Sequence, residues 1–338
     1  THLTAMLADR AALLTNNAFD NCCFAAGHAL PPLVDAAAPI FTLLGRRQFL
    51  RTHINHKPGN HNFGVDNRQQ LYHFIGDVFY PGDKKFNRHE IPSEKEIKTY
   101  DELIVPLPKD NHTFNTLALG LIKNFPKPQT GSKAKQRAKL LKIIHAKNYK
   151  AKPKQTAGEG GVTHYQFQIG NDWTVPGTVF TPANPKGTTL LIADTGRKTQ
   201  TAAVKKLLAE DHRVVAFDPF FFGESKIKSR DFLHVLLVHA VGERALGIQS
   251  GQIAAVANWA KQEFGGAVTL HSSGPRLSVS ARLAAVQTKA ISTVQLESPM
   301  KSLKEVITAN KGANHLPELM CYGLLEHFDL EQIEAIKK

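Results

Sequence analysis

The hydrophobic and polar positions near the start of the chain predict two short strands. Residues 11–19, AALLTNNAF, form an apolar run that predicts a buried strand ending at Asp20. Residues 48–56, QFLRTHINH, alternate between apolar and polar positions, which predicts a second strand.

Two longer segments of the same region have helical periodicity. Residues 26–45 predict a helix whose start is marked by Pro31 and Pro32 and whose end is marked by Gly45. Residues 65–80 predict an amphipathic helix. Its apolar face would consist of Leu71, Phe74, Ile75, Val78 and Phe79. A strand–helix–strand–helix order is typical of a parallel α/β sheet.

Residues 81–155 lack this rhythm. The pattern indicates a short extended stretch at Leu103–Leu107, a helix capped near Asp110 or Asn111, and one helix at 133–147. We interpret the whole region as a connector that packs lightly on its neighbours.

The α/β pattern resumes at residue 156 and continues toward the end of the sequence. Residues 165–182 predict an antiparallel pair of strands. Further strands are predicted within 187–196, 213–225, 267–276 and 290–299, and helices within 199–212, 242–265, 277–289 and 302–312. Strands that alternate with helices through short loops favour a parallel sheet covered on both faces.

Composition and charge narrow the function classes. The 338 residues are 42% hydrophobic, which is enough for a core, and the formal net charge is +13. Residues 124–154 carry nine Lys, one Arg and no acid. We interpret this basic run as a solvated linker, with docking to an acidic partner as the alternative. Nucleic-acid binding is disfavoured because Phe125 and Tyr149 are its only aromatic residues.

Cysteines and hydropathy give no sign of a metal site, a disulfide or a membrane span. The three cysteines are Cys22, Cys23 and Cys321, which cannot close a disulfide framework and lack zinc-ligand spacing. Three histidines stand between residues 53 and 61, but no carboxylate or cysteine accompanies them at a regular ligand spacing. No apolar run reaches the roughly 18 residues of a transmembrane helix, and no signal peptide is visible.

Five segments carry a resemblance to a known family. They are FDPFFFGES (217–225), LIADTG (191–196), AVTLHSSGPRLSVSARLAA (267–285), NAFDNCCF (17–24) and HKPGNHNF (56–63). In type and relative spacing they resemble the α/β-hydrolases. More narrowly, the chain resembles the large acetyl-xylan-esterase-like hydrolases that carry two tandem hydrolase modules.

The resemblance implies an α/β-hydrolase-type, mostly parallel sheet with helices on both faces, split into two partial modules. Residues 1–80 would be the C-terminal part of one module, 81–155 a basic connector, and 156–338 the N-terminal part of a second module. In such hydrolases the chain order is nucleophile, acid, histidine, whereas here the acid and histidine segments come first. The chain is therefore either the middle of a tandem protein or a permuted single hydrolase. In the tandem case other fragments or copies would complete the sheets, in an oligomer or multi-chain assembly. In the permuted case residues 1–80 would complete the sheet of residues 156–338.

Asp20 and His61 are the candidates for the acid and the base. Asp20 follows a buried strand and His61 stands in a Pro-Gly loop, where an imidazole can reach a cleft. The alternative is that Asp20 caps a turn and His61 is a surface histidine. The nearest competing bases are His28, His53 and His56.

The nucleophile position has two alignments. In one, Ser273 is the nucleophile, and His271 and Pro275 stand where the Gly-x-Ser-x-Gly pattern has glycines. In the other, Gly274 occupies the nucleophile position and the turn is catalytically inactive. A purely structural alternative is that Ser272 and Ser273 form a turn that caps the next helix.

The function that the resemblance implies is serine-type hydrolysis of a carboxylic ester without cofactor or metal. The substrate would be a small ester or an acetylated carbohydrate, and Gly196 could donate a backbone N–H to the oxyanion. The alternative is a catalytically degenerate scaffold or assembly subunit. The compartment stays open; only the resemblance suggests a secreted or periplasmic location.

Overall fold

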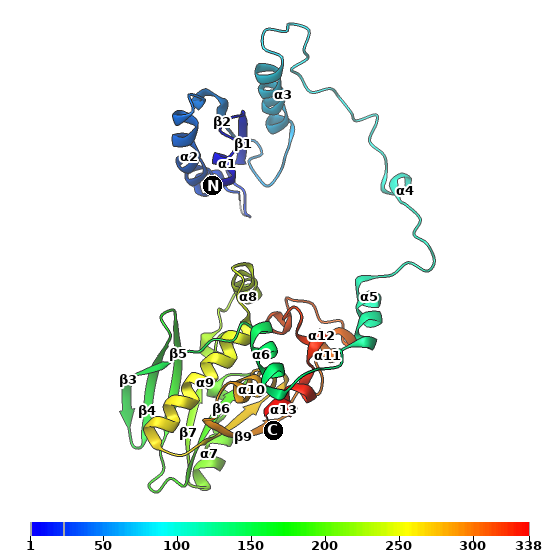
Figure 1. Ribbon diagram of the computed structural model, residues 1–338. Helices are drawn as coiled ribbons and strands as arrows, with labels where there is room; N and C mark the ends of the chain where they lie inside the picture. The colour runs from blue at the N-terminus through cyan, green and yellow to red at the C-terminus, as the bar shows by residue number, and fades with distance from the viewer. Residues whose placement is uncertain (1, 23, 338) are drawn as a thin grey trace. The chain divides into compact units, whose positions relative to one another are not determined.

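The computed structural model describes residues 2–22 and 24–337, and the chain divides into two compact units with the boundary between Leu107 and Pro108 (Figure 1). Cys23, one of the cysteines considered above, lies outside the described residues. The sequence predicted three parts, and the boundary between the two units falls inside the predicted connector 81–155.

The first unit contains the strand–helix–strand–helix order that the sequence predicts. β1 and β2 are parallel, in a register that runs from Ala12 opposite Leu50 to Asn17 opposite Asn55. The elements are α1 (His2–Ala5), β1 (Ala12–Asn17), α2 (Ala26–Leu43), β2 (Leu50–Asn55), α3 (Val65–Phe79) and α4 (Tyr100–Leu103). Pro31 and Pro32 lie inside α2 and do not mark its start, because the helix already begins at Ala26.

The core of the first unit is small. Its buried hydrophobic cluster consists of Ala8, Ala12, Ala37, Phe41 and Leu50. On the predicted apolar face of α3 only Phe74 is buried, and Phe79 is 68% exposed. Other large exposed side chains of this unit include Leu3, Met6, Phe19, Leu43 and Val65. A two-stranded sheet is marginally stable alone, and parallel strands are normally covered on both faces.

The second unit is built on a seven-stranded sheet with the order β3-β4-β5-β7-β6-β8-β9. The strands are β3 (Ala151–Glu159), β4 (Val162–Ile169), β5 (Trp173–Phe180), β6 (Gly187–Ala193), β7 (His212–Phe217), β8 (Val268–Ser273) and β9 (Ile291–Glu297). The predicted antiparallel pair is β4 and β5, and β7, β6, β8 and β9 are mutually parallel. The edge strand β3 was not predicted, because its basic sequence was assigned to the connector.

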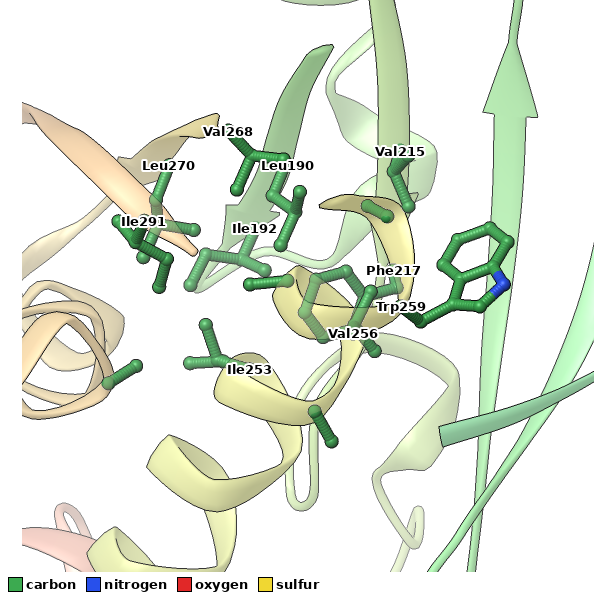
Figure 2. Packing of buried hydrophobic residues seen from close by; sticks show 14 of the residues in the cluster. Leu190, Ile192, Val215, Phe217, Ile253, Val256, Trp259, Val268, Leu270 and Ile291 are labelled. Carbon is green, nitrogen blue, oxygen red and sulfur yellow. The ribbon is translucent and has the colours of Figure 1, made fainter. Parts of the chain in front are cut away.

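Helices cover both faces of this sheet, as predicted. The largest core cluster packs α9 (Ala245–Phe264) and α10 (Pro275–Gln287) against one face, where Leu190 and Ile192 point from β6 (Figure 2). The neighbouring Leu191 points to the opposite face and packs against α7 (Thr201–Ala209). This alternation of side chains buries β6 on both faces.

The basic region is more ordered than the sequence indicated. α5 (Phe114–Leu121) begins after Thr113, which forms a capping box with Thr116, and not near Asp110 or Asn111. α6 (Lys133–Ile143) contributes the fully buried Leu140, and Ile144 follows it into the same core cluster. The expectation that the whole region packs lightly is corrected for α6 and the residue after it, because Leu140 and Ile144 anchor them to the core of the second unit.

Four helices complete the second unit. They are α8 (Asp231–Ala240), α11 (Lys304–Thr308), α12 (Leu324–His327) and α13 (Leu330–Lys337). Within the part of the chain that the structure describes, no helix combines the length and the apolar character that crossing a membrane requires.

Candidate active site

The structure brings Asp20 and His61 together at the carboxyl ends of β1 and β2. Asp20 lies three residues after β1, and His61 lies in the loop between β2 and α3. Nδ1 of His61 is 2.9 Å from Oδ2 of Asp20, and the other carboxylate oxygen accepts the backbone N–H of Cys22 at 2.7 Å. The pair therefore has the acid–base geometry in which a carboxylate orients an imidazole.

The side chains of Asp20 and His61 differ in their exposure to solvent. The Asp20 side chain is 1% exposed, whereas that of His61 is 58% exposed. Because a carboxylate accepts hydrogen bonds, a neutral His61 imidazole paired in this way carries its proton on Nδ1 and keeps a lone pair on Nε2. Three exposed phenylalanines, Phe19, Phe24 and Phe63, stand close to the pair in sequence, and the Phe24 ring lies 6.4 Å from the imidazole.

The competing histidines lack this arrangement. His53 contacts Asp66 through its other ring nitrogen, with Nε2 2.7 Å from Oδ2. His28 and His56 are exposed, and neither has a hydrogen-bonded carboxylate among the described residues. His61 is the base that the geometry favours, and His53 offers a natural control.

In the second unit, β8 ends at Ser273 and Gly274 forms the turn into α10. Gly274 has φ 105° and ψ 156°, a backbone region that only glycine adopts readily. The Ser273 side chain is partly exposed and makes no hydrogen bond to any described residue. Ser273 belongs to a different unit from Asp20 and His61. The local geometry fits the alignment in which Gly274 stands at the nucleophile position.

The space at this turn is filled by Asp194, the residue that follows β6. A Cβ atom added to Gly274 would lie 2.5 Å from Cγ of Asp194 and 2.6 Å from its Oδ2. The same carboxylate accepts the backbone N–H of Arg276 at 2.9 Å and that of Leu277 at 2.7 Å. The amino end of α10, which stabilises an oxyanion in an acyl-transfer enzyme, thus binds a carboxylate of its own chain.

Burial and ion pairing also hold the side chains of Asp194 and Arg276 in place at this turn. Burial raises the pKa of Asp194 above the ordinary aspartate range, against the opposing effect of the two backbone hydrogen bonds. Arg276 forms a bidentate ion pair with the fully buried Glu318, at 2.5 and 2.7 Å. Its guanidinium also lies over the rings of Phe221 and Phe222. Sequence reasoning missed Asp194; its signal was an acid directly after a buried strand.

Two other candidate groups of the second unit, at Gly196 and Cys321, are held or buried by the fold itself. The N–H of Gly196, proposed as an oxyanion donor, is bonded to the carbonyl of Ala193 at 2.8 Å. Burial raises the pKa of Cys321 to about 12, which leaves its thiol protonated at neutral pH. The described residues contain no group of three or more His, Cys, Asp and Glu side chains placed to hold a metal ion.

The sheet of the second unit identifies its fold. Apart from the edge strand β3, the strands lie in the order first, second, fourth, third, fifth, sixth, and only β5 is antiparallel to the rest. The fifth of these, β8, leads through a glycine turn into a helix. This is the arrangement in which α/β-hydrolases present their nucleophile.

No protein-family model matches the chain, and a search among curated proteins finds no match. Solved structures with some similarity include a candidate acetyl xylan esterase from Bacteroides fragilis NCTC 9343, with 14% identity and a TM-score of 0.45 over 56% of this chain and 61% of that chain. Acetyl xylan esterase 1 from Thermoanaerobacterium sp. JW/SL YS485 has 13% identity and a TM-score of 0.40 over 65% of this chain and 76% of that chain. A thermostable carboxyl esterase from Bacillus coagulans has 16% identity and a TM-score of 0.33 over 48% of this chain and 56% of that chain.

This chain thus matches only about three fifths of the length of the Bacteroides fragilis protein. At these levels of identity the similarity concerns the fold and gives no residue roles. The strand order and the turn after β8 carry the conclusion: the chain has an α/β-hydrolase-type fold, and the solved structures it resembles include acetyl xylan esterases.

Proposed function

We propose that the first unit supplies the general base of a serine-type carboxylic ester hydrolase. The observation that carries the proposal is the 2.9 Å contact between Nδ1 of His61 and the buried carboxylate of Asp20. It leaves Nε2 on an exposed ring at the carboxyl ends of two parallel strands, where hydrolases of this fold assemble their site.

The chemistry follows from these groups. Nε2 of His61 takes the proton of a serine hydroxyl while the serine oxygen attacks the ester carbonyl, and Asp20 stabilises the imidazolium that forms. His61 then gives the proton to the departing alcohol. It activates a water in the same way, and the water releases the acid and regenerates the serine.

We propose that the nucleophilic serine belongs to a further hydrolase segment or polypeptide that covers the first unit. Support comes from the turn at Gly274, where the nucleophile position has no side chain and Asp194 fills the space. The two-stranded sheet of the first unit has many exposed apolar side chains, as an incomplete module would. The expected partner carries the first six strands of an α/β-hydrolase sheet with a serine at its turn.

The proposed substrate is a small ester, with acetylated carbohydrate as the class suggested by the fold. Phe19, Phe24 and Phe63 provide apolar surface near His61 that suits an acyl group better than a charged one. We propose a non-catalytic, structural role for the second unit, because its anion-binding helix end already holds Asp194.

The test is ester hydrolysis by the protein purified under non-denaturing conditions through a tag on this chain. His61→Ala should lower kcat/KM for p-nitrophenyl acetate by about 10²–10⁴-fold, the usual contribution of a general base. His53→Ala is the matched control and should keep wild-type turnover, since His53 pairs with Asp66 outside the proposed site. Turnover of His61→Ala within twofold of wild type would overturn the proposal.

A further inference from the structure

The loop that carries His61 is held by buried asparagine side chains. The carbonyl oxygen of Asn62, the residue after His61, accepts a hydrogen bond from Nδ2 of Asn17 at 2.8 Å and another from Nδ2 of Asn67 at 3.3 Å. Asn67 also donates to Oδ1 of Asn17 at 2.9 Å. Asn17 ends β1 and Asn67 lies in the first turn of α3, and they are 7% and 1% exposed.

The other end of the loop is held in the same way. Oδ1 of Asn55, at the end of β2 and fully buried, accepts the N–H of Gly59 at 2.9 Å. The carbonyl of Gly59 in turn accepts the N–H of Phe19 at 2.8 Å. Phe19 directly precedes Asp20, so one set of hydrogen bonds fixes the residue before the carboxylate and the other fixes the residue after the imidazole.

These hydrogen bonds leave two buried amide atoms unpaired, which is unfavourable for stability. Oδ1 of Asn67 and Nδ2 of Asn55 are buried without a hydrogen-bond partner among the described residues. An unpaired buried amide atom is unfavourable for folding, and each of these two side chains carries one while its other amide atom holds a backbone group of the loop. The His61 ring, by contrast, is largely exposed and gains little orientation from packing.

We infer that Asn67 and Asn17 are positioning residues that hold His61 in the rotamer and tautomer that face Asp20. The inference depends on the proposed function only for its catalytic consequence; the geometry of the imidazole can be measured separately. Fixing one backbone carbonyl next to His61 restricts the ring to the arc in which Nδ1 reaches the carboxylate.

The two His–Asp pairs of this unit give the experiment an internal reference. His61 faces its carboxylate with Nδ1, whereas His53 faces Asp66 with Nε2. In their neutral forms the two imidazoles therefore have opposite tautomers, which long-range ¹H–¹⁵N spectra of the histidine-labelled full chain distinguish. His61→Gln and His53→Gln assign the two signals.

In Asn67→Ala we expect the Nδ1–H tautomer of His61 to lose population by about twofold to tenfold relative to the other tautomer, the factor that a net hydrogen bond corresponds to. The His53 signal should not change. Gln70→Ala is the matched control, because Gln70 is an amide on the same helix whose side chain has no hydrogen bond within the described residues. If Asn67→Ala does not fold, Asn67→Ser replaces it, since its hydroxyl is smaller and still polar.

An unchanged His61 tautomer in a folded Asn67 variant would overturn the inference. The catalytic consequence has its own measurement: the same variant should lower kcat for p-nitrophenyl acetate and leave KM unchanged. A shifted tautomer with unchanged kcat would contradict the catalytic role of His61 and leave the positioning by Asn67 intact. The two failures are therefore distinguishable.

Discussion

A side chain at position 274 should clash with Asp194, and the resulting loss of stability can be estimated from the structure. Gly274→Ala places a Cβ 2.5 Å from Cγ and 2.8 Å from Cβ of Asp194. Asp194 cannot move away freely, because its carboxylate holds the N–H groups of Arg276 and Leu277. The substitution also forces a non-glycine residue to φ 105°.

Two terms make up the expected loss. Backbone strain in this region costs about 1–3 kcal/mol for a residue other than glycine. Displacement of Asp194 adds about 1–3 kcal/mol, as overpacking of a closed site usually does. Gly274→Ala should therefore lower the free energy of unfolding by about 2–6 kcal/mol, the sum of these ranges.

A double-mutant cycle separates the terms. In an Asp194→Ala background, Gly274→Ala should cost only the strain, so the two substitutions should couple by about 1–3 kcal/mol. Urea unfolding followed by tryptophan fluorescence is a suitable assay, because the two tryptophans, Trp173 and Trp259, both lie in the second unit. Additive effects, with the full loss of stability retained without the Asp194 carboxylate, would show that Asp194 does not fill the space that a side chain at position 274 needs.

Three further predictions concern the second unit. Leu140→Ala should lower the free energy of unfolding by about 2–5 kcal/mol, because Leu140 is fully buried. Lys139→Ala should lower it by less than about 0.5 kcal/mol, because Lys139 is exposed. Equal effects of the two substitutions in urea unfolding would contradict the assignment of α6 to the core. Glu318→Ala should cost about 3–5 kcal/mol, because Arg276 then lacks its buried partner, and a neutral result in thermal unfolding would show that the pair is dispensable. Burial raises the pKa of Asp194, so the folded state binds the Asp194 proton more tightly than the unfolded state does. The difference in free energy of unfolding between wild type and Asp194→Asn should therefore shrink as pH rises from about 4 through the raised pKa. A difference that grows with pH would contradict this direction.

The sequence predicted the sheet of the second unit well, because its strands and helices differ clearly in period. Leu190 and Ile192 stand within one continuous apolar run, as a strand buried on both faces requires. Prediction failed where local signals competed with packing. Pro31 and Pro32 suggested a helix start but are tolerated inside α2, and the lysines around Leu140 hid a core helix.

The contact between Asp20 and His61 could be predicted from the sequence, whereas the catalytic roles of the two residues stay predictions. Asp20 and His61 could be singled out from their places after a strand and in a Pro-Gly loop, and the structure places them in hydrogen-bond contact. Asp194 also follows a buried strand directly, but its place beside Gly274, 80 positions away in sequence, could not be read from that local signal. The role of Asn67 depends on its contact with Asn17, 50 positions away, which no local pattern encodes.

In the proposed mechanism His61 activates a serine that is not in the turn at Gly274. A direct test is to treat the natively purified protein with a fluorophosphonate probe and to locate the modified serine by peptide mass spectrometry. We expect modification of a serine on a co-purifying hydrolase segment, at a rate that falls sharply in His61→Ala. Modification of Ser273, with the same dependence on His61, would contradict the proposed mechanism.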